Sequence, residues 1–426
     1  MNIVMMTNTY LPHVGGVARS VHSFVEGYRQ RGHRVLVVAP EFPGVAEREQ
    51  GVIRLPALQR FNGSDFSVVL PVPGHLSAAL DAFEPDLIHS HHPFLVGSTA
   101  LRAAQSRSCP LVFTHHTMYE QYTHYVPGDS EPLRRFVVQL SVSYANLCDQ
   151  VFAPSESVAE VLRRRGVERP VEVLPTGVRR EDFARGDGPG FRRALGIPEE
   201  ARVVGHLGRL APEKNLDFLG RAVARVLRED PQAWFLVVGD GPSSRDLQRS
   251  MAQAGVAERL CLAGKRVQPE LADAYHAMDL FAFASLSETQ GMVLAEAMAA
   301  GLPVVALDAP GAREVVDDGH NGRLLAGEDE VGFAAAVAQQ LRAVAEDPQP
   351  WRRAVAETAA RYDTQRCVDQ ALRAYGRLTE GRSASRTEAD DAWRASMGRI
   401  RAEWDLIKGV AQAAGAAARE REDPAA

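Results

Sequence analysis

The chain has 426 residues and a formal net charge of −6; 45% of its residues are hydrophobic and 24% are charged. These fractions are ordinary for a globular protein, and the length exceeds what one hydrophobic core usually holds, so two domains are expected. The negative charge excludes a global positive field for nucleic acid. The four cysteines (Cys109, Cys148, Cys261 and Cys367) lie far apart without a C-x-x-C pair, so neither a disulfide framework nor a zinc site is expected.

The first ten residues, MNIVMMTNTY, lack the positively charged region of a signal peptide. No apolar run reaches the roughly 18 residues that a membrane-spanning helix needs. We therefore expect a cytoplasmic protein and leave open peripheral contact at the inner membrane surface.

Short apolar runs alternate with amphipathic stretches from the beginning of the chain. Residues 2–6 read as a buried strand, residues 17–31 as a helix and residues 34–39 as the next strand. Further strands are expected at residues 87–89, 110–113, 151–153 and 171–174. Continuous Val, Ile and Leu runs indicate a parallel sheet that is covered on both faces.

The same alternation restarts after a break rich in Gly, Pro and Asp at residues 185–190. A helix is expected at residues 216–228, and strands at residues 202–207, 234–238, 260–263, 280–283 and 303–306. The predicted fold class is α/β, with two facing Rossmann-like domains, residues 1–185 and 191–363, and a ligand cleft between them. The alternative is two independent α/β domains without a shared site.

The C-terminal segment is predicted to be helical as well. A helix at residues 364–380 follows the second domain and either ends it or crosses back to the first. Residues 381–426 read as a linker and an amphipathic helical tail, in which apolar residues recur at heptad spacing over residues 393–414. This spacing fits an oligomer contact, a membrane-docking helix or a helix packed on its own protein.

Two glutamates flank the most informative loop. Glu288 precedes a loop and Glu296 lies in the first turns of the helix that follows it. Backbone N–H groups at such a helix N-terminus suit a diphosphate or sugar hydroxyls, and a carboxylate accepts two hydroxyl hydrogen bonds. The alternative is a capped surface helix with solvated glutamates.

Two cations follow the first strand of the second domain. Arg209 and Lys214 lie between that strand and the next helix, at the edge of the sheet where ligands bind. Two cations there suit a diphosphate and the negative charge that builds on a departing nucleotide. A solvated loop pair is the alternative.

A glycine pair, Gly15 and Gly16, follows the first strand and permits close approach of a ligand to the backbone, although a plain turn explains it equally well. The segment does not match G-x-G-x-x-G, so a nicotinamide or flavin site has little support.

Histidines follow two strands of the first domain. His115 and His116 come after the strand at residues 110–113, and only one of two adjacent side chains is expected to face a ligand. A histidine there can hydrogen-bond a sugar hydroxyl or assist proton transfer. His89, His91 and His92 form another strand-end cluster, but no accompanying motif supports a metal site.

Together these motifs resemble the retaining glycosyltransferases of the GT-B fold, family 4, over roughly residues 1–378. The strongest mark is Glu288 to Glu296, which matches the family's E-x7-E motif. Gly208-Arg209…Lys214-Asn and Pro310-Gly-Ala-Arg-Glu314…Gly319-His-Asn-Gly322 support it in the same order and spacing.

The resemblance implies roles for these residues. Arg209 and Lys214 would bind the donor diphosphate and stabilise the leaving group, His116 and Glu288 would contact the donor sugar, and Glu296 would bind the ribose. Gly16, with Gly15 beside it, would close on the phosphates and acceptor, and the backbone of Val267 would hold the base. The loop and helix start that bind the donor with Glu288 comprise Thr289, Gln290, Gly291, Met292 and Val293. Family members retain the anomeric configuration without a metal and use no cofactor beyond the nucleotide diphosphate sugar, here expected to be UDP-glucose.

The acceptor prediction rests on residues 115–127, which look like the corresponding stretch of bacterial diacylglycerol glucosyltransferases. Met118, Tyr119, Tyr122 and Tyr125 recur at near-helical spacing and suit an acyl glycerol or the membrane interface. An ordinary amphipathic helix is the alternative. We therefore predict glucosyl transfer to a lipid such as diacylglycerol. The rivals are a small soluble or polysaccharide acceptor, a phosphorylase and a non-catalytic sugar-nucleotide-binding protein.

Overall fold

The computed structural model describes residues 1–426 except 14, 43–48, 59–67, 70–72, 122–129 and 381–426. The chain divides into two compact units. The first consists of residues 1–176 with the described residues from Cys367 onward, and the second of residues 177–366. The predicted break at residues 185–190 lies inside the second unit, because it packs on a helix there: a Cβ at Gly188 would come within 2.1 Å of the His276 carbonyl oxygen.

The first unit is built on a parallel seven-stranded sheet with the order β3-β2-β1-β6-β7-β8-β9. Its strands are β1 (Asn2–Met6), β2 (Arg34–Pro40), β3 (Val52–Leu55), β6 (Leu87–Ser90), β7 (Leu111–Thr114), β8 (Gln150–Ala153) and β9 (Val171–Val173). A separate antiparallel pair joins β4 (Ala57–Leu58) to β5 (Val68–Val69).

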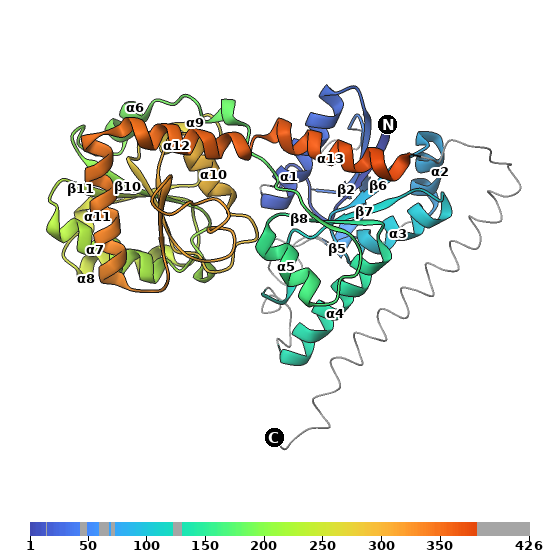
Figure 1. Ribbon diagram of the computed structural model, residues 1–426, viewed down its shortest axis with the longest axis horizontal. Coiled ribbons are helices and arrows are strands. Elements are labelled where there is room, and N and C mark those ends of the chain that lie inside the picture. Colours follow the sequence, from blue (N-terminus) through green and yellow to red (C-terminus); the bar gives the residue numbers. More distant parts are fainter. Residues whose placement is uncertain (14, 43–48, 59–67, 70–72, 122–129, 381–426) are drawn as a thin grey trace, which may run out of the picture. The chain divides into compact units, whose positions relative to one another are not determined.

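Helices cover both faces of this sheet, which is why its strands are apolar throughout (Figure 1). They are α1 (Gly16–Gln30), α2 (Pro73–Phe83), α3 (Val96–Ser106), α4 (Glu131–Leu147), α5 (Glu156–Arg164) and α13 (Thr364–Thr379). Along β1, Val4 and Met6 pack with α2 to α5, whereas Ile3 and Met5 pack with α1 and α13. Alternate side chains therefore serve two separate cores.

The second unit repeats the scheme with a parallel six-stranded sheet in the order β12-β11-β10-β13-β14-β15. Its strands are β10 (Arg202–Leu207), β11 (Ala233–Val238), β12 (Leu260–Gly264), β13 (Leu280–Phe283), β14 (Val304–Leu307) and β15 (Gly322–Leu325). Along β13, Phe281 and Phe283 face one core, and Leu280 and Ala282 face the other.

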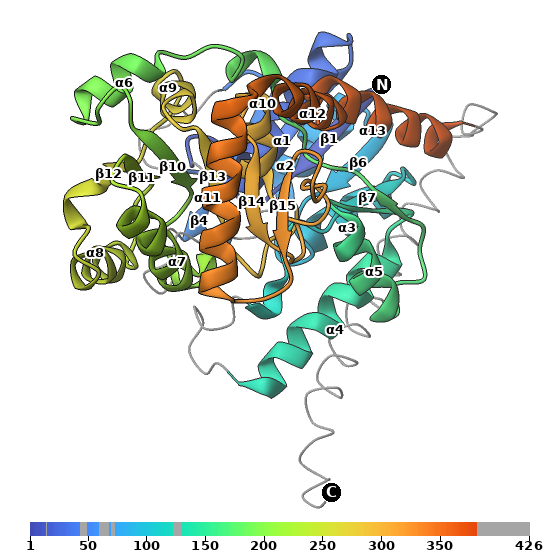
Figure 2. The same cartoon turned by 60° about the vertical axis from the view of Figure 1, so that its left-hand side comes forward.

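The helices of this unit again lie on both faces of the sheet, and Figure 2 shows α11 alongside β14 and β15. They are α6 (Gly188–Ala194), α7 (Leu216–Glu229), α8 (Ser244–Gln253), α9 (Glu270–His276), α10 (Met292–Ala299), α11 (Glu330–Glu346) and α12 (Pro348–Arg361). Three 3₁₀ turns, η3 (Arg180–Asp182), η4 (Pro212–Lys214) and η5 (Ala257–Arg259), complete it.

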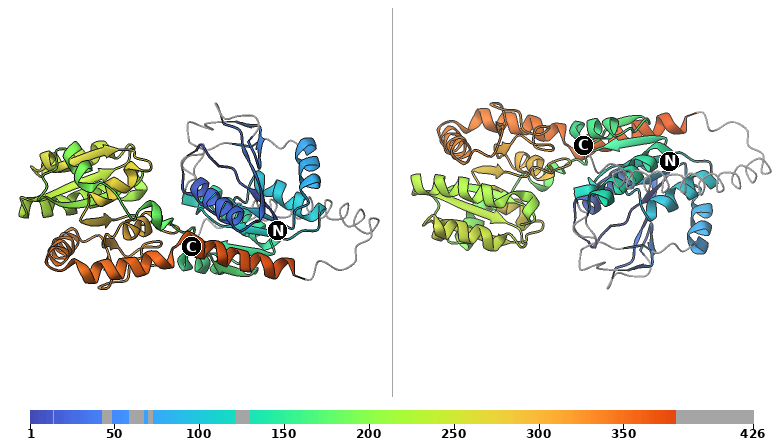
Figure 3. Two further views of the ribbon diagram at one scale, coloured as in Figure 1. Left: turned by 90° about the horizontal axis from the view of Figure 1, so that it is seen from above. Right: turned by 90° about the horizontal axis from the view of Figure 1, so that it is seen from below.

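Helix α13 returns the chain to the first unit, along which it lies in Figure 3, where it is red. Its buried side chains include Val368 and Tyr375, and the Tyr375 hydroxyl lies 2.9 Å from the hydroxyl of Tyr28 on α1. The sequence prediction left the destination of this helix open; its apolar face belongs to the core beneath α1. The heptad segment 393–414 lies outside the described residues.

The sequence analysis did not predict four short strands: β3, β15 and the two strands of the β4–β5 pair. β3 reads VIRL and β15 reads GRLL, so each carries a charged residue within a run of only four positions.

Among the described residues, no helix has the length and apolar character that crossing a membrane requires.

Candidate functional site

The order of the strands marks where a ligand binds in the second unit. From β10 the chain moves through β11 to β12 on one side, and β13 then pairs with the opposite edge of β10. Parallel α/β sheets bind ligands outside the carboxyl ends of the strands at such a reversal of strand order. The switch point of this unit therefore lies between the ends of β10 and β13.

Two predicted site residues meet at this switch point. Lys214 follows β10 and Glu288 follows β13, and the Lys214 ammonium forms an ion pair with Glu288 Oε1. The two side chains are 19% and 18% exposed, so the pair is largely shielded but still reachable from solvent. An ammonium group in such a place can exchange its carboxylate partner for the oxygens of an incoming phosphate.

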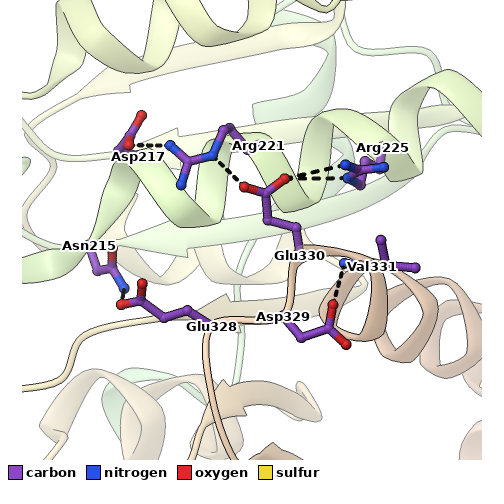
Figure 4. A network of polar contacts seen from close by, with 8 residues as sticks. All are labelled: Asn215, Asp217, Arg221, Arg225, Glu328, Asp329, Glu330 and Val331. Carbon is purple, nitrogen blue, oxygen red and sulfur yellow. Dashed lines mark hydrogen bonds and ion pairs between the residues drawn. The ribbon is translucent and has the colours of Figure 1, made fainter.

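The backbone at Lys214 is fixed by its neighbour. Lys214 ends η4, and Asn215 adopts a left-handed conformation with φ of 53° before α7 begins. The Asn215 side-chain amide donates to Glu328 Oε1 over 2.8 Å. Figure 4 shows this bond beside the ion pairs of Arg221 with Asp217 and Glu330, so α7 is tied to the start of α11 next to Lys214.

Arg209, the other predicted cation, lies in the loop directly after β10. Its guanidinium donates to Glu213 Oε1, and the side chain is half exposed. The backbone carbonyl of Glu213 accepts a hydrogen bond of 3.1 Å from the Ser285 hydroxyl, which follows β13. The structure therefore joins the loops after β10 and β13 through backbone as well as side chains.

The glutamate loop ends in a tight glycine turn. Gly291 precedes α10 with φ of 69°, and a Cβ there would lie 2.5 Å from the Gly311 carbonyl oxygen. Only glycine fits this left-handed and crowded position. Thr289 is half-buried, Gln290 is buried, and Met292 and Val293 begin α10 half-buried. The N-terminus of α10, the positive end of its dipole, thus follows Glu288 directly.

Glu296 and Glu288 make different contacts. Glu296 is 2% exposed and accepts a hydrogen bond of 2.9 Å from the Tyr275 hydroxyl of α9. A buried carboxylate requires such partners because desolvation disfavours its charge. Sequence reasoning missed Tyr275, since it lies in an ordinary amphipathic helix without a local motif.

Val267 lies in the loop between β12 and α9 and is 57% exposed. Its carbonyl oxygen accepts a hydrogen bond from the Leu271 amide at the start of the helix. The strand it follows, β12, is two places from β10 in the same sheet, so Val267 lies at the same carboxyl edge as Arg209.

His206 is a site neighbour that the sequence does not mark. It is fully buried in β10 beside the rings of Phe281 and Phe283, and its Nδ1 lies 3.1 Å from the Ala282 carbonyl oxygen. Burial, together with the charge of nearby Lys214, lowers the pKa of His206 to about 4. The imidazole is therefore neutral near pH 7 and does not repel the cation.

The first unit has its own switch point, between β1 and β6. Gly15 and Gly16 follow β1, where Gly15 caps α1 and Gly16 begins it. Neither has a positive φ. A Cβ at Gly16 would meet none of the described atoms within 4 Å, whereas one at Gly15 would lie 3.0 Å from His13 Nε2. Open space at Gly16 is what a ligand-facing backbone needs.

The two adjacent histidines after β7 point in different directions. His116 Nε2 lies 2.9 Å from His91 Nδ1, which follows β6. The buried His115 lies instead beside α4, with Nδ1 3.4 Å from the Ser141 hydroxyl. Burial lowers the pKa of both His115 and His116 to about 3, so both are neutral near pH 7.

Both ring nitrogens of His89 have partners in the core. Its Nδ1 lies 2.6 Å from the Tyr375 hydroxyl and its Nε2 lies 2.7 Å from Thr114 Oγ1. Within the described ranges, no three His, Cys, Asp or Glu side chains are grouped to hold a metal ion.

Tyr119 is half-buried and packs edge-on against Phe94 and His115. Tyr122 and Tyr125, also predicted to contact the acceptor, lie outside the described residues. Met118 packs against the core beneath α2 to α5.

Two parallel α/β units with these switch-point residues fit a glycosyltransferase, and comparisons with known proteins show that class. Residues 14–182 match the family described as Glycosyltransferase Family 4, and residues 201–343 match Glycosyl transferases group 1. The chain belongs to the family 4 glycosyltransferases, and its two Rossmann-like units are those of the GT-B fold.

Similar proteins include enzymes with different donors and acceptors. The chain is 30% identical to the alpha-monoglucosyldiacylglycerol synthase of Streptococcus pneumoniae, covering 78% of this chain and 77% of that protein. It is 32% identical to a GDP-mannose-dependent alpha-mannosyltransferase of Mycobacterium tuberculosis, covering 79% and 87%. It is 36% identical to a D-inositol 3-phosphate glycosyltransferase of Stackebrandtia nassauensis, covering 70% of each.

The fold is also that of solved structures. The crystal structure of Anabaena Alr3699/HepE in complex with UDP superposes with a TM-score of 0.69 at 23% identity, covering 88% of this chain and 100% of that chain. WaaG, a glycosyltransferase involved in lipopolysaccharide biosynthesis, gives a TM-score of 0.64 at 16% identity, covering 89% and 100%.

Proposed function

We propose that this glycosyltransferase moves glucose from UDP-glucose to a diacylglycerol-type lipid with retention of the anomeric configuration. Two similar enzymes, from Streptococcus pneumoniae and Acholeplasma laidlawii, are alpha-monoglucosyldiacylglycerol synthases. The observation that carries the donor half of the proposal is the Lys214–Glu288 pair at the switch point of the second unit.

The leaving group is stabilised by the two cations. Arg209 and Lys214 are held by the carboxylates of Glu213 and Glu288. A diphosphate offers each cation a more highly charged partner, so both turn to its oxygens when the donor binds. They then neutralise the charge that grows on the departing UDP in the transition state.

The remainder of the donor has partners at the same edge of the sheet. Glu288, once Lys214 has turned away, accepts hydrogen bonds from hydroxyls of the sugar, next to the N-terminus of α10. Glu296 accepts hydrogen bonds from the ribose. The backbone of Val267 holds the base.

In the reaction, the acceptor oxygen attacks the anomeric carbon from the face that the diphosphate leaves. The bond from that carbon to the phosphate oxygen breaks, and the proton of the acceptor hydroxyl passes to the departing phosphate. Neutral His116 hydrogen-bonds a hydroxyl of the sugar and orients it. Gly16 lets the backbone approach the phosphates.

No metal ion is required in this scheme, because Arg209 and Lys214 supply the positive charge that a divalent cation supplies elsewhere. Turnover is expected to persist in excess EDTA. A complete loss of turnover in EDTA that Mg²⁺ or Mn²⁺ restores would overturn this part of the proposal.

A second candidate is transfer to a small soluble acceptor, with a GDP-linked donor as a further possibility. It is favoured by the similarity to D-inositol 3-phosphate glycosyltransferases at up to 36% identity and to GDP-mannose-dependent mannosyltransferases at up to 32%. These proteins have the same family architecture with different substrates, so donor and acceptor must be measured together.

The test is release of nucleoside diphosphate from a panel that includes UDP-glucose, UDP-galactose, UDP-N-acetylglucosamine and GDP-mannose. Each donor is offered with diacylglycerol vesicles, with phosphatidylcholine vesicles as control, and with inositol 3-phosphate. Release from UDP-glucose that only diacylglycerol stimulates, with a glucolipid as product, supports the proposal. Release that the vesicles do not change but inositol 3-phosphate stimulates would overturn the proposal and favour the second candidate.

A further inference from the structure

A fully buried tyrosine, Tyr275, donates a hydrogen bond to Glu296. Tyr275 is fully buried, and its ring packs edge-on against Phe183 at 5.6 Å and obliquely against Phe281 at 5.9 Å. Its hydroxyl lies 2.9 Å from Glu296 Oε2 and 3.4 Å from the Val293 carbonyl oxygen. Because the ring cannot swing, the direction of the hydroxyl is fixed by the core.

This contact determines how the carboxylate is presented. Glu296 lies in α10 and its side chain has three rotatable bonds, so packing of the helix alone does not set the plane of the carboxylate. A hydrogen bond from Tyr275 to Oε2 sets that plane and stabilises the charge. Each carboxylate oxygen can accept two hydrogen bonds, so the bond from Tyr275 to Oε2 does not by itself prevent Glu296 from accepting a pair of vicinal hydroxyls.

We propose that Tyr275 is a positioning residue that gives the Glu296 subsite its selectivity for ribonucleotide over deoxyribonucleotide donors. The inference rests on the proposed function, in which Glu296 binds the ribose. A ribose offers adjacent 2′ and 3′ hydroxyls, whereas a 2′-deoxyribose offers only one of them. Two vicinal hydroxyls can both donate to one carboxylate only if its plane is oriented correctly. A single hydroxyl can donate to the carboxylate in many orientations.

The experiment compares the binding of UDP and 2′-deoxy-UDP to the full chain by calorimetry. The wild type is expected to bind UDP roughly tenfold more tightly than 2′-deoxy-UDP, the loss that one hydrogen bond to a charged group represents. In Tyr275→Phe the ring remains and the hydroxyl is lost, so this ratio should fall to roughly twofold, chiefly through weaker UDP binding.

Tyr362→Phe is the matched control. Tyr362 belongs to the same unit and donates from its hydroxyl to the Glu314 carbonyl oxygen over 2.6 Å. Its loss should leave the ratio of UDP to 2′-deoxy-UDP affinity unchanged. If Tyr275→Phe fails to fold, 3-fluorotyrosine at position 275 retains the ring and the hydroxyl but strengthens the phenol as a donor, and the ratio should rise.

The possible results distinguish the role of Tyr275 from the assignment of Glu296 to the ribose. If the wild type discriminates and Tyr275→Phe discriminates as strongly, or weakens both ligands equally, Tyr275 has only a structural role and the inference is overturned. If the wild type does not discriminate at all, the assignment of Glu296 to the ribose fails first and the inference fails with it.

Discussion

Lys214 and Glu288 are 74 positions apart in the sequence, yet their side chains form an ion pair at the carboxyl ends of two adjacent parallel strands. The pair exists because β13 returns to the side of β10 that β11 does not occupy. It brings one residue from each of the two most informative sequence motifs into contact.

Replacing Lys214 by Ala tests its role toward the leaving group. We expect the turnover number to fall by about 10²–10³-fold, the loss typical of one group that stabilises transition-state charge, while donor affinity falls only a few-fold. The measurement is kcat with UDP-glucose beside the donor Kd from calorimetry. Arg249→Ala, at an exposed arginine on α8 that pairs with Asp246, is the control and should change neither value. Equal losses in kcat and Kd would contradict a leaving-group role.

Asn215 variants test whether the turn after Lys214 positions the cation. Asn215→Gly loses the bond to Glu328 but keeps the left-handed backbone. Because the backbone places Lys214, this variant should retain most of the turnover. Asn215→Val strains the same backbone, so it should lower the unfolding free energy by roughly 1–2 kcal/mol, displace Lys214 and lower kcat. Steady-state kinetics and thermal unfolding measure both effects. Equal kcat in the two variants would show that the turn does not position Lys214.

Gly291 and Gly301 form a matched pair for the turn before α10. Both have positive φ, but a Cβ at Gly301 would meet no atom of the described part of the chain within 4 Å, whereas one at Gly291 would meet the Gly311 carbonyl oxygen at 2.5 Å. Gly301→Ala should cost about 1 kcal/mol of unfolding free energy and retain donor binding. Gly291→Ala should cost about 2–4 kcal/mol and weaken UDP binding at least roughly tenfold. Urea denaturation and calorimetry distinguish them, and similar values for both would contradict the crowding argument.

The buried histidines make stability depend on pH. Burial lowers the pKa of His115 to about 3 in the folded chain, against about 6.5 when unfolded. The unfolded state therefore binds more protons below pH 6.5, and the free energy of unfolding falls as pH decreases from 6.5 toward 3, by up to about 1.4 kcal/mol per pH unit for each such histidine. His115→Asn should therefore reduce the slope of unfolding free energy against pH by up to about 1.4 kcal/mol per pH unit. Urea denaturation between pH 7 and pH 4.5 measures this slope. Parallel curves for the two proteins would show that His115 does not titrate on unfolding.

Much of this architecture could be read from the sequence because it depends on local pattern. Continuous apolar runs predicted β1 and β13 with the observed bounds, since a strand buried on both faces needs apolar residues at every position. The same logic failed for β15, where Gly322 and Arg323 interrupt the run and only pairing with β14 defines the strand. The glutamate motif and the cations after β10 were also visible in the sequence, because glycines and charges beside an apolar strand mark its ligand end.

Contacts between distant residues were decided by the tertiary structure alone. Nothing near Glu296 in the sequence indicates Tyr275, and nothing near Tyr28 indicates Tyr375 at the far end of the chain. Strand order is not encoded in any single strand, so the ion pair of Lys214 with Glu288 could not be foreseen from either motif. The sequence determined which residues carry charge and which segments are buried, because those properties are local. The fold decided which charges meet, because that depends on how parallel strands are ordered and how their helices pack.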